Sequence, residues 1–150
     1  MTAGKMKHRS DKPAVTGDKP LCRAPKESAR KAGAAGEDFA ALLLTQDGYR
    51  ILCRNYKGSH GEIDIIAEKD AYIIFAEVKL RKILSQKPAQ AVDSEKMLHI
   101  VNTAHEFLCE YKENTYIASL SPRFDVIEIV VCKGAPAVHR HLTDVYHAFL

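Results

Sequence analysis

The chain has 150 residues, of which 46% are hydrophobic, and it carries a formal net charge of +3 at pH 7. These values fit one globular domain with a sizeable core. They exclude a membrane-spanning protein, because no apolar run reaches the length of about 18 residues that a spanning helix needs. The start of the chain is basic and lacks the apolar segment of a secretory signal peptide, so we expect a cytoplasmic protein.

The charge is unevenly distributed along the chain. Residues 1–31 carry nine Lys or Arg against three Asp or Glu, whereas residues 32–150 carry 13 against 16. Residues 1–27 show no apolar period, so we interpret them as a flexible, disordered basic arm that precedes a single domain at 28–150. The arm either attracts phosphates without sequence preference or serves as a solubilising tail. The mildly acidic domain disfavours a large nucleic-acid groove.

Several common site motifs are missing from the sequence. The four cysteines lack C-x-x-C spacing, which disfavours a zinc knuckle or a thioredoxin-type motif. Three of them, Cys53, Cys109 and Cys132, lie in apolar segments, where we expect buried, reduced thiols. Neither a G-x-x-x-x-G-K-[ST] loop nor a G-x-S-x-G elbow occurs, which excludes a P-loop nucleotide enzyme on motif grounds.

The first half of the domain predicts a helix and then three strands. The helix is expected at 28–46, and its small residues would let it pack close to a sheet. A strand at 49–56 and a hairpin with arms at 62–68 and 72–82 follow, with the turn at Lys69-Asp70. The apolar stripe of the helix consists of Ala32, Ala35, Phe39, Leu42 and Leu43, and its small residues are Gly33, Gly36 and Ala40.

The second half predicts a long helix at 88–111 and a loop at 112–122 with a short extended piece at 116–120. A strand at 123–132 follows, and a final strand edge and short helix occupy 139–150. The order α-β-β-β-α-β is typical of the α/β class, with a mixed sheet flanked by helices. The long helix would connect two parallel strands. Its expected apolar face consists of Ala91, Leu98, Val101, Ala104, Phe107 and Leu108.

Three ionisable residues interrupt the apolar hairpin strands. Asp64 lies in GEIDIIA, whereas Glu77 and Lys79 lie in FAEVKLR. Because side chains alternate faces along a strand, Asp64 shares a face with Ile66, and Glu77 and Lys79 share a face with Phe75. Depending on the length of the turn, Asp64 lies opposite Phe75 or opposite Glu77. Either register brings the carboxylates of Asp64 and Glu77 within roughly 5–8 Å, as direct or diagonal neighbours.

Two carboxylates this close repel each other unless a positive charge neutralises them. Lys79 neutralises part of their charge, and a divalent cation can neutralise the rest. A Mg²⁺ ion held in this way polarises a phosphate and lowers the pKa of its water, which is the chemistry of phosphodiester hydrolysis. A solvated surface hairpin has the same spacing, but solvated faces seldom combine Phe75 and Ile66 with three charges.

Five segments carry a family resemblance: GEDFA at 36–40, GYRILCRN at 48–55, GEIDIIA at 61–67, FAEVKLR at 75–81 and RFDVIEI at 123–129. Together they resemble the YraN family of small bacterial proteins. The family resembles Holliday junction resolvases and has a restriction-endonuclease-like fold. The resemblance covers about residues 30–132 and implies a metal-dependent endonuclease that hydrolyses branched or single-stranded DNA, acting as a homodimer. The alternative is a non-catalytic nucleic-acid-binding or scaffold protein that keeps the nuclease fold.

The resemblance also implies a catalytic set. The fold's pattern is an acid on the first helix, an Asp on a strand, and an acid-x-Lys on the next strand. Carried over to this sequence, it selects Glu37, Asp64, Glu77 and Lys79. It implies Mg²⁺ or Mn²⁺ bound by Asp64, Glu77 and the backbone carbonyl of Val78. For Glu37 the alternative is an ordinary charge in the first turn of a helix.

Further polar residues flank the predicted site. Arg54, Asn55 and Arg81 are candidate nucleic-acid-binding residues, and surface salt bridging is the alternative role for the arginines. Lys96 on the long helix either reaches the edge of the site or is plain solvent-exposed surface, and we favour the second.

Three polar residues of the last third have other expected roles. We expect Asp125 to form a structural brace with an arginine such as Arg54. His139 and His141 share a strand face, which fits metal-ligand spacing, but no third ligand follows at a recognised spacing.

Overall fold

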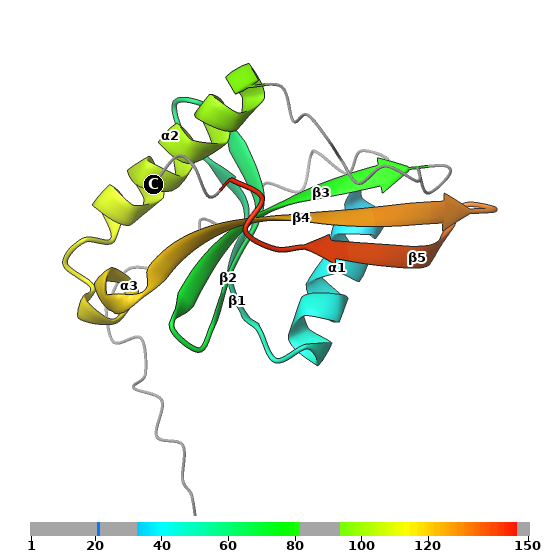
Figure 1. Cartoon of the computed structure of the whole chain (residues 1–150), viewed down its shortest axis with the longest axis horizontal. Coiled ribbons are helices and arrows are strands. Elements are labelled where there is room, and N and C mark those ends of the chain that lie inside the picture. The colour runs from blue at the N-terminus through cyan, green and yellow to red at the C-terminus, as the bar shows by residue number, and fades with distance from the viewer. Residues whose placement is uncertain (1–20, 22–32, 82–93, 147–150) are drawn as a thin grey trace, which may run out of the picture.

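The protein is described by a computed structural model at residue 21, residues 33–81 and residues 94–146. In these residues one open mixed β-sheet carries helices on its faces, so the fold is α/β (Figure 1). The predicted α-β-β-β-α-β order is confirmed, with one further helix before the fourth strand, and the expected final strand follows the fourth. The elements are α1 (Ala34–Gln46), β1 (Arg50–Lys57), β2 (Glu62–Lys69), β3 (Tyr72–Arg81), α2 (Ser94–Glu110), α3 (Thr115–Ser119), β4 (Ser121–Cys132) and β5 (Ala135–Leu142).

The strands lie in the spatial order β1-β2-β3-β4-β5. Only β3 and β4 pair in parallel among these neighbours, and the other three pairs are antiparallel. The parallel pair is joined through α2, as predicted, because two parallel strands need a long crossover connection. This arrangement puts the end of β3 in the middle of the sheet, beside β4.

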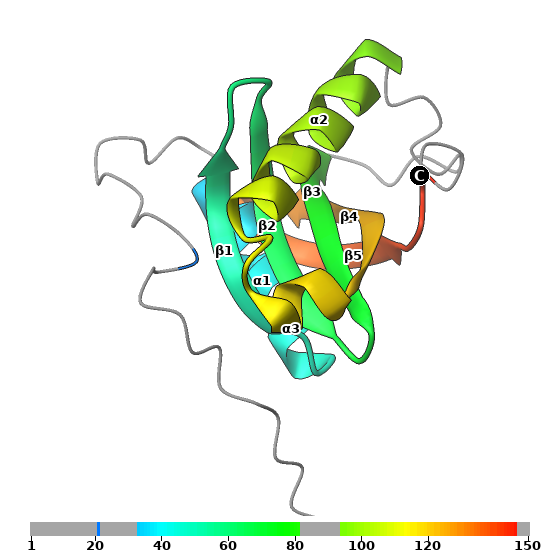
Figure 2. The same ribbon diagram turned by 90° about the vertical axis from the view of Figure 1, so that its left-hand side faces the viewer.

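Two hydrophobic cores lie on opposite faces of the sheet. Figure 2 shows α2 and α3 in front of the sheet and α1 behind it. Ile66 and Phe75 belong to the core under α2, whereas their strand neighbours Ile65 and Ile74 belong to the core under α1. The hairpin strands therefore alternate with a period of two, as expected.

The buried face of α1 differs from the predicted stripe. Gly36, Ala40 and Leu44 are its buried residues, whereas Leu42 is 52% exposed. A Cβ atom at Gly36 would overlap the side chain of Leu80 on β3. The expectation of close packing is confirmed, because Gly36 and Ala40 face the sheet together with the larger Leu44. The small side chains at positions 36 and 40 let the helix backbone approach β3.

The long helix keeps most of its predicted apolar face. Ala104 and Phe107 of α2 are buried as predicted, and Val101 and Leu108 pack against the same core. Ile100 is buried although it was not predicted to be, whereas Leu98 is 57% exposed. The described part of α2 begins at Ser94, so the predicted start at residue 88 lies outside the described residues.

The segment expected to be extended at 116–120 is instead the short helix α3. The Asn114 side chain caps this helix, because its Oδ1 accepts a hydrogen bond from the Ile117 N–H at 3.1 Å. Ile117 is buried in the core under α2. A side-chain cap and a buried contact therefore override the weak strand propensity of the segment.

The last strand begins earlier than predicted. Lys133 and Gly134 both have positive φ angles, of 50° and 80°, as the tight turn between two hairpin strands requires. Strand β5 therefore starts at Ala135 and pairs with β4 directly after this turn. No helix occurs at residues 143–146, and the rest of the predicted C-terminal helix lies outside the described residues.

The cysteines match the expectation of buried, reduced thiols only in part. Cys53 is buried as expected but disulfide-bonded, whereas Cys109 and Cys132 are free thiols as expected but exposed. Apart from residue 21, the predicted basic arm lies outside the described residues. No helix in the described ranges is long and apolar enough to cross a bilayer.

Candidate active site

The predicted site lies at a fork between β2 and β3. The last residues paired between these strands are Ile65 and Ala76. Beyond them, the first residues of β2 pair with β1 and the last residues of β3 pair with β4. The Val78 N–H donates a hydrogen bond to Asp64 Oδ2 at 2.7 Å, across the opening of the fork. Continuing the register puts Asp64 opposite Glu77, which is one of the two predicted registers.

Asp64 lies in an environment that disfavours its charge. Burial raises the pKa of its carboxyl group to about 6, although the hydrogen bond from Val78 acts in the opposite direction. The negative charges of Glu37, Glu77 and Glu62 raise this pKa further. Glu37 and Glu77 are therefore close enough to Asp64 to act on it, and a cation at the fork would relieve their mutual repulsion.

Glu37 approaches the fork from α1. It lies in the first turn of the helix, is half-buried, and accepts a hydrogen bond from Asn55 Nδ2 at 2.8 Å. Asn55 has a φ angle of 53°, a left-handed conformation that Asn adopts more readily than most residues. In this structure the Asn55 amide, predicted to bind nucleic acid, orients the Glu37 carboxylate.

Glu77 has two carboxylate oxygens in different environments. Its side chain is only 12% exposed. Oε1 accepts a hydrogen bond from Lys96 Nζ, whereas Oε2 is buried and has no hydrogen-bond partner among the residues that the structure describes. The expectation that Lys96 is a plain surface residue is wrong, because packing of α2 on the sheet brings its ammonium group to the fork.

Lys79 and Arg81 follow Glu77 on the same face of β3. Both are half-buried, and Lys79 lies beside Glu128 in the β3–β4 register. Arg81 Nε donates to Glu128 Oε1 at 2.9 Å, and Arg140 on β5 lies 3.6 Å from the other carboxylate oxygen. Glu128 as the partner of these arginines was not predicted, although an acid inside the apolar run VIEIVV indicates a buried charged group.

The ion-pair partners of Arg54 and Asp125 differ from the predicted ones. Arg54 forms an ion pair with Asp38 at 2.7 Å, so the predicted brace between Asp125 and an arginine is confirmed with Arg123 as the partner rather than Arg54. Asp125 is buried and binds Arg123 and His141. Burial opposes the charge of Asp125, but hydrogen bonds from these two partners and from a backbone N–H lower its pKa below the ordinary value.

The remaining histidine of the predicted pair packs against α1. The ring of His139 contacts the ring of Phe39 edge-on, with 6.4 Å between the centroids. Across the described parts of the chain, no three His, Cys, Asp or Glu side chains gather closely enough to form a preassembled metal site.

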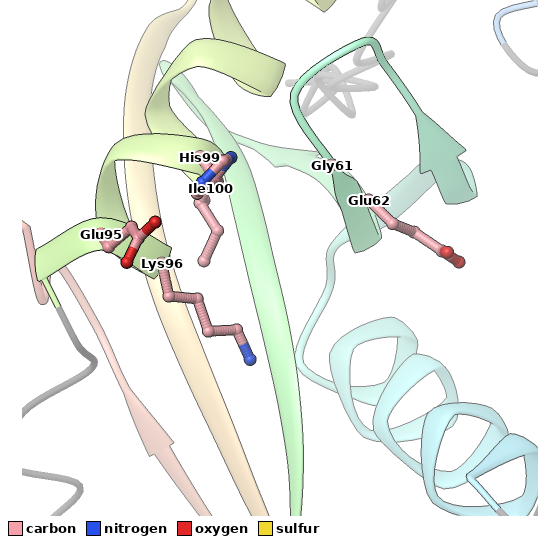
Figure 3. A pocket seen from close by; sticks show the side chains of 6 residues that line it. All are labelled: Gly61, Glu62, Glu95, Lys96, His99 and Ile100. Atoms are coloured by element: carbon pink, nitrogen blue, oxygen red, sulfur yellow. The ribbon is translucent and has the colours of Figure 1, made fainter.

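A pocket of about 300 Å³ lies beside the fork, between the start of β2 and α2 (Figure 3). The Lys96 side chain extends from α2 toward β3, and Gly61 and Glu62 lie at the opposite side of the pocket. His99 Nδ1 donates to the His60 carbonyl at 2.7 Å, since a carbonyl can only accept. The pocket is lined by Gly61, Glu62, Glu95, Lys96, His99 and Ile100.

Comparison with known proteins agrees with the sequence resemblance. The model of a family described as Uncharacterised protein family UPF0102 matches residues 36–129, which include all four predicted catalytic residues. The chain is 40% identical over 124 residues to a UPF0102 protein of Prosthecochloris aestuarii, covering 77% of this chain and 93% of that protein. It is 39% identical over 104 residues to a UPF0102 protein of Caldicellulosiruptor bescii, covering 68% and 84%. It is 47% identical over 98 residues to a UPF0102 protein of Clostridium perfringens, covering 65% and 77%. The chain therefore belongs to family UPF0102, the YraN family.

Proposed function

We propose that this protein is a metal-dependent endonuclease that hydrolyses DNA phosphodiester bonds, on branched or single-stranded DNA. The observation that carries the proposal is the fork, where Asp64 and Glu77 lie opposite each other and Lys79 follows on the same strand face. Two half-buried acids beside an amine repel each other and lower stability, so their arrangement is typical of a functional site.

The donor set of the fork fits Mg²⁺ or Mn²⁺. Mg²⁺ binds hard oxygen atoms, needs only one or two protein carboxylates, and keeps several waters. Asp64 and Glu77 supply these carboxylates, and the backbone carbonyl of Val78 is the third proposed ligand. A buried carboxylate oxygen without a partner, as found at Glu77 among the described residues, is costly unless a ligand satisfies it. A bound ion would supply Lewis-acid activation of the phosphate and of the attacking water.

The side chains around the carboxylates have separate proposed roles. Lys79 stabilises the negative charge that develops on the phosphate, or orients the nucleophile, because its ammonium group shares the face of Glu77. Glu37, held by Asn55, completes the acidic side of the site. Arg54, Asn55 and Arg81 are the proposed contacts to DNA phosphates, and the arginines would exchange their ion pairs with Asp38 and Glu128 for these contacts.

The proposal includes two properties of the whole protein. The YraN resemblance supports a homodimer, which light scattering of the purified protein would test. We also propose a cytoplasmic location, because the proposed substrate is DNA, and cell fractionation would test it.

A second function has its own supporting observation. Lys96 already neutralises Glu77 by an ion pair, which is what a site without a metal would need. A non-catalytic nucleic-acid-binding or scaffold protein would keep the fold, the acidic fork and this ion pair.

A cleavage assay separates these two functions. Labelled four-way junction, single-stranded and duplex DNA are incubated with Mg²⁺ or Mn²⁺ and with wild type, Glu77→Ala or Glu113→Gln. Glu113 is an exposed acid in the turn after α2 and serves as the matched control. Cutting by wild type and Glu113→Gln, but not by Glu77→Ala, supports the nuclease. Binding with equal background cutting by all three contradicts it and supports the second function.

A further inference from the structure

Lys96 is the one described residue of α2 whose side chain is bonded to the carboxylate of Glu77. The two ends of this ion pair differ in their freedom. Glu77 is 12% exposed and sits in the sheet, whereas Lys96 is 57% exposed and reaches the fork on a flexible four-carbon chain. The carboxylate is therefore the fixed partner and the ammonium group is the movable one.

A cation and the Lys96 ammonium group cannot use the same carboxylate without repulsion. The proposed metal needs Glu77, and a divalent ion at the fork would lie near the ammonium group that now binds Oε1. Like charges at contact distance disfavour each other, so binding of one weakens binding of the other. The two cations are therefore thermodynamically linked through Glu77.

The structure also provides space into which Lys96 can move. Lys96 lines the pocket of about 300 Å³ beside the fork, together with two acids, Glu62 and Glu95 (Figure 3). A displaced ammonium group would stay in a negatively charged, solvent-open environment. Its release from Glu77 therefore requires only rotation of side-chain bonds, with no movement of α2.

We propose that Lys96 is an internal counter-ion of the active site, which holds Glu77 in place before metal binding and is displaced into the neighbouring pocket by the divalent cation. This inference rests on the proposed function, because it takes Glu77 as a metal ligand. It makes Lys96 a positioning residue that competes with the metal, and its effect is on metal affinity.

Metal titration tests this competition without any measurement of cleavage. Mn²⁺ binding is measured by calorimetry for wild type, Lys96→Met, Lys96→Arg and Glu77→Gln. Lys96→Met keeps the length of the side chain but removes the charge, whereas Lys96→Arg keeps the charge. Lys112→Met, an exposed lysine just after the far end of α2, is the matched control.

Competition predicts that Lys96→Met binds Mn²⁺ roughly two- to fivefold more tightly than wild type, the range expected for an exposed ion pair. Lys96→Arg and Lys112→Met should bind like wild type, and Glu77→Gln should lose binding. Equal or weaker Mn²⁺ binding by Lys96→Met than by wild type overturns the competition by Lys96. If that binding is still lost in Glu77→Gln, the proposed metal site stands. Absence of Glu77-dependent binding in both wild type and Lys96→Met overturns the competition and the metal site together. Tighter binding by Lys96→Met without DNA cleavage keeps the inference and contradicts the nuclease.

Discussion

Asp64 and Val78 are joined across the open end of the β2–β3 ladder, where the Val78 N–H donates to Asp64 Oδ2 at 2.7 Å. A backbone donor that has lost its neighbouring strand is thus satisfied by a side chain. The same contact orients the Asp64 carboxylate toward β3 and Glu77. This hydrogen bond does not fully stabilise the ionised carboxylate, because burial and three nearby acids raise the pKa of Asp64 to about 6.

The raised pKa of Asp64 predicts a pH-dependent stability. Because the pKa rises from 3.8 to about 6 on folding, the folded protein binds more protons than the unfolded chain between these values. The contribution of Asp64 is therefore fully present below its ordinary pKa and is lost as the pH rises through about 6. Asp64→Asn should be more stable than wild type by about 1–2 kcal/mol near pH 8 in EDTA, and equally stable near pH 4.

Urea denaturation of both proteins at several pH values measures this difference. Asp70→Asn, in the exposed turn between β2 and β3, is the control, and its pH profile should follow that of wild type. Parallel profiles for Asp64→Asn and wild type would show that the fork does not disfavour the charge of Asp64.

Asn55 is predicted to act through both its backbone and its side chain. Asn55→Ala should cost about 1–2 kcal/mol, because it loses the hydrogen bond to Glu37 and forces Ala into the left-handed region. Asn55→Gly should cost less, because Gly adopts this conformation freely and only the hydrogen bond is lost. Thermal unfolding of the two variants measures the difference. Equal costs would mean that the φ angle at this position contributes nothing.

Gly36 and Leu80 are predicted to be energetically coupled. Gly36→Ala places a methyl group against the Leu80 side chain, and the overlap should outweigh the gain of about 1 kcal/mol in helix propensity. We expect a net loss of about 1–2 kcal/mol for Gly36→Ala alone. In a Leu80→Ala background the same change should be neutral or stabilising. A double-mutant cycle by urea denaturation measures the coupling, and additive effects would contradict the close approach of α1 to β3.

Glu106 is predicted to tie the β1–β2 loop to α2. Its carboxylate accepts hydrogen bonds from the Ser59 N–H at 2.7 Å and from Ser59 Oγ at 2.6 Å, and it also contacts His60. The Ser59 hydrogen bonds, with that from His60, lower the pKa of Glu106 to about 2. The tie is therefore present above the ordinary pKa of 4.5 and is lost only as the pH falls through about 2.

Glu106→Gln should speed hydrogen exchange of the Ser59 amide at neutral pH, because a neutral acceptor binds the N–H more weakly. Exchange is followed by NMR, with Glu113→Gln as the control. Unchanged exchange at Ser59 in Glu106→Gln would show that the loop is held by other contacts.

Much of the fold was predictable from the sequence, and so was the common face of the two acids, because both depend on local periods. The alternation of two along the hairpin placed Asp64 and Glu77 on one face, and the order of elements implied a parallel β3–β4 pair. The effects of turn and cap residues were predicted less accurately. Asn114 caps a helix in a segment that was expected to be extended, and the left-handed turn at Lys133-Gly134 starts β5 earlier than expected.

The sequence by itself determined the order of the elements along the chain, the family, and the shared strand face of Glu77 and Lys79, since these follow from motifs and from the period of two within single segments. Only the tertiary structure decided that Lys96 binds Glu77, that Asn55 holds Glu37, and that Leu44 rather than Leu42 lies on the buried face of α1. These contacts depend on how each helix lies against the sheet. That placement follows from packing of whole surfaces, which no period within a single segment encodes.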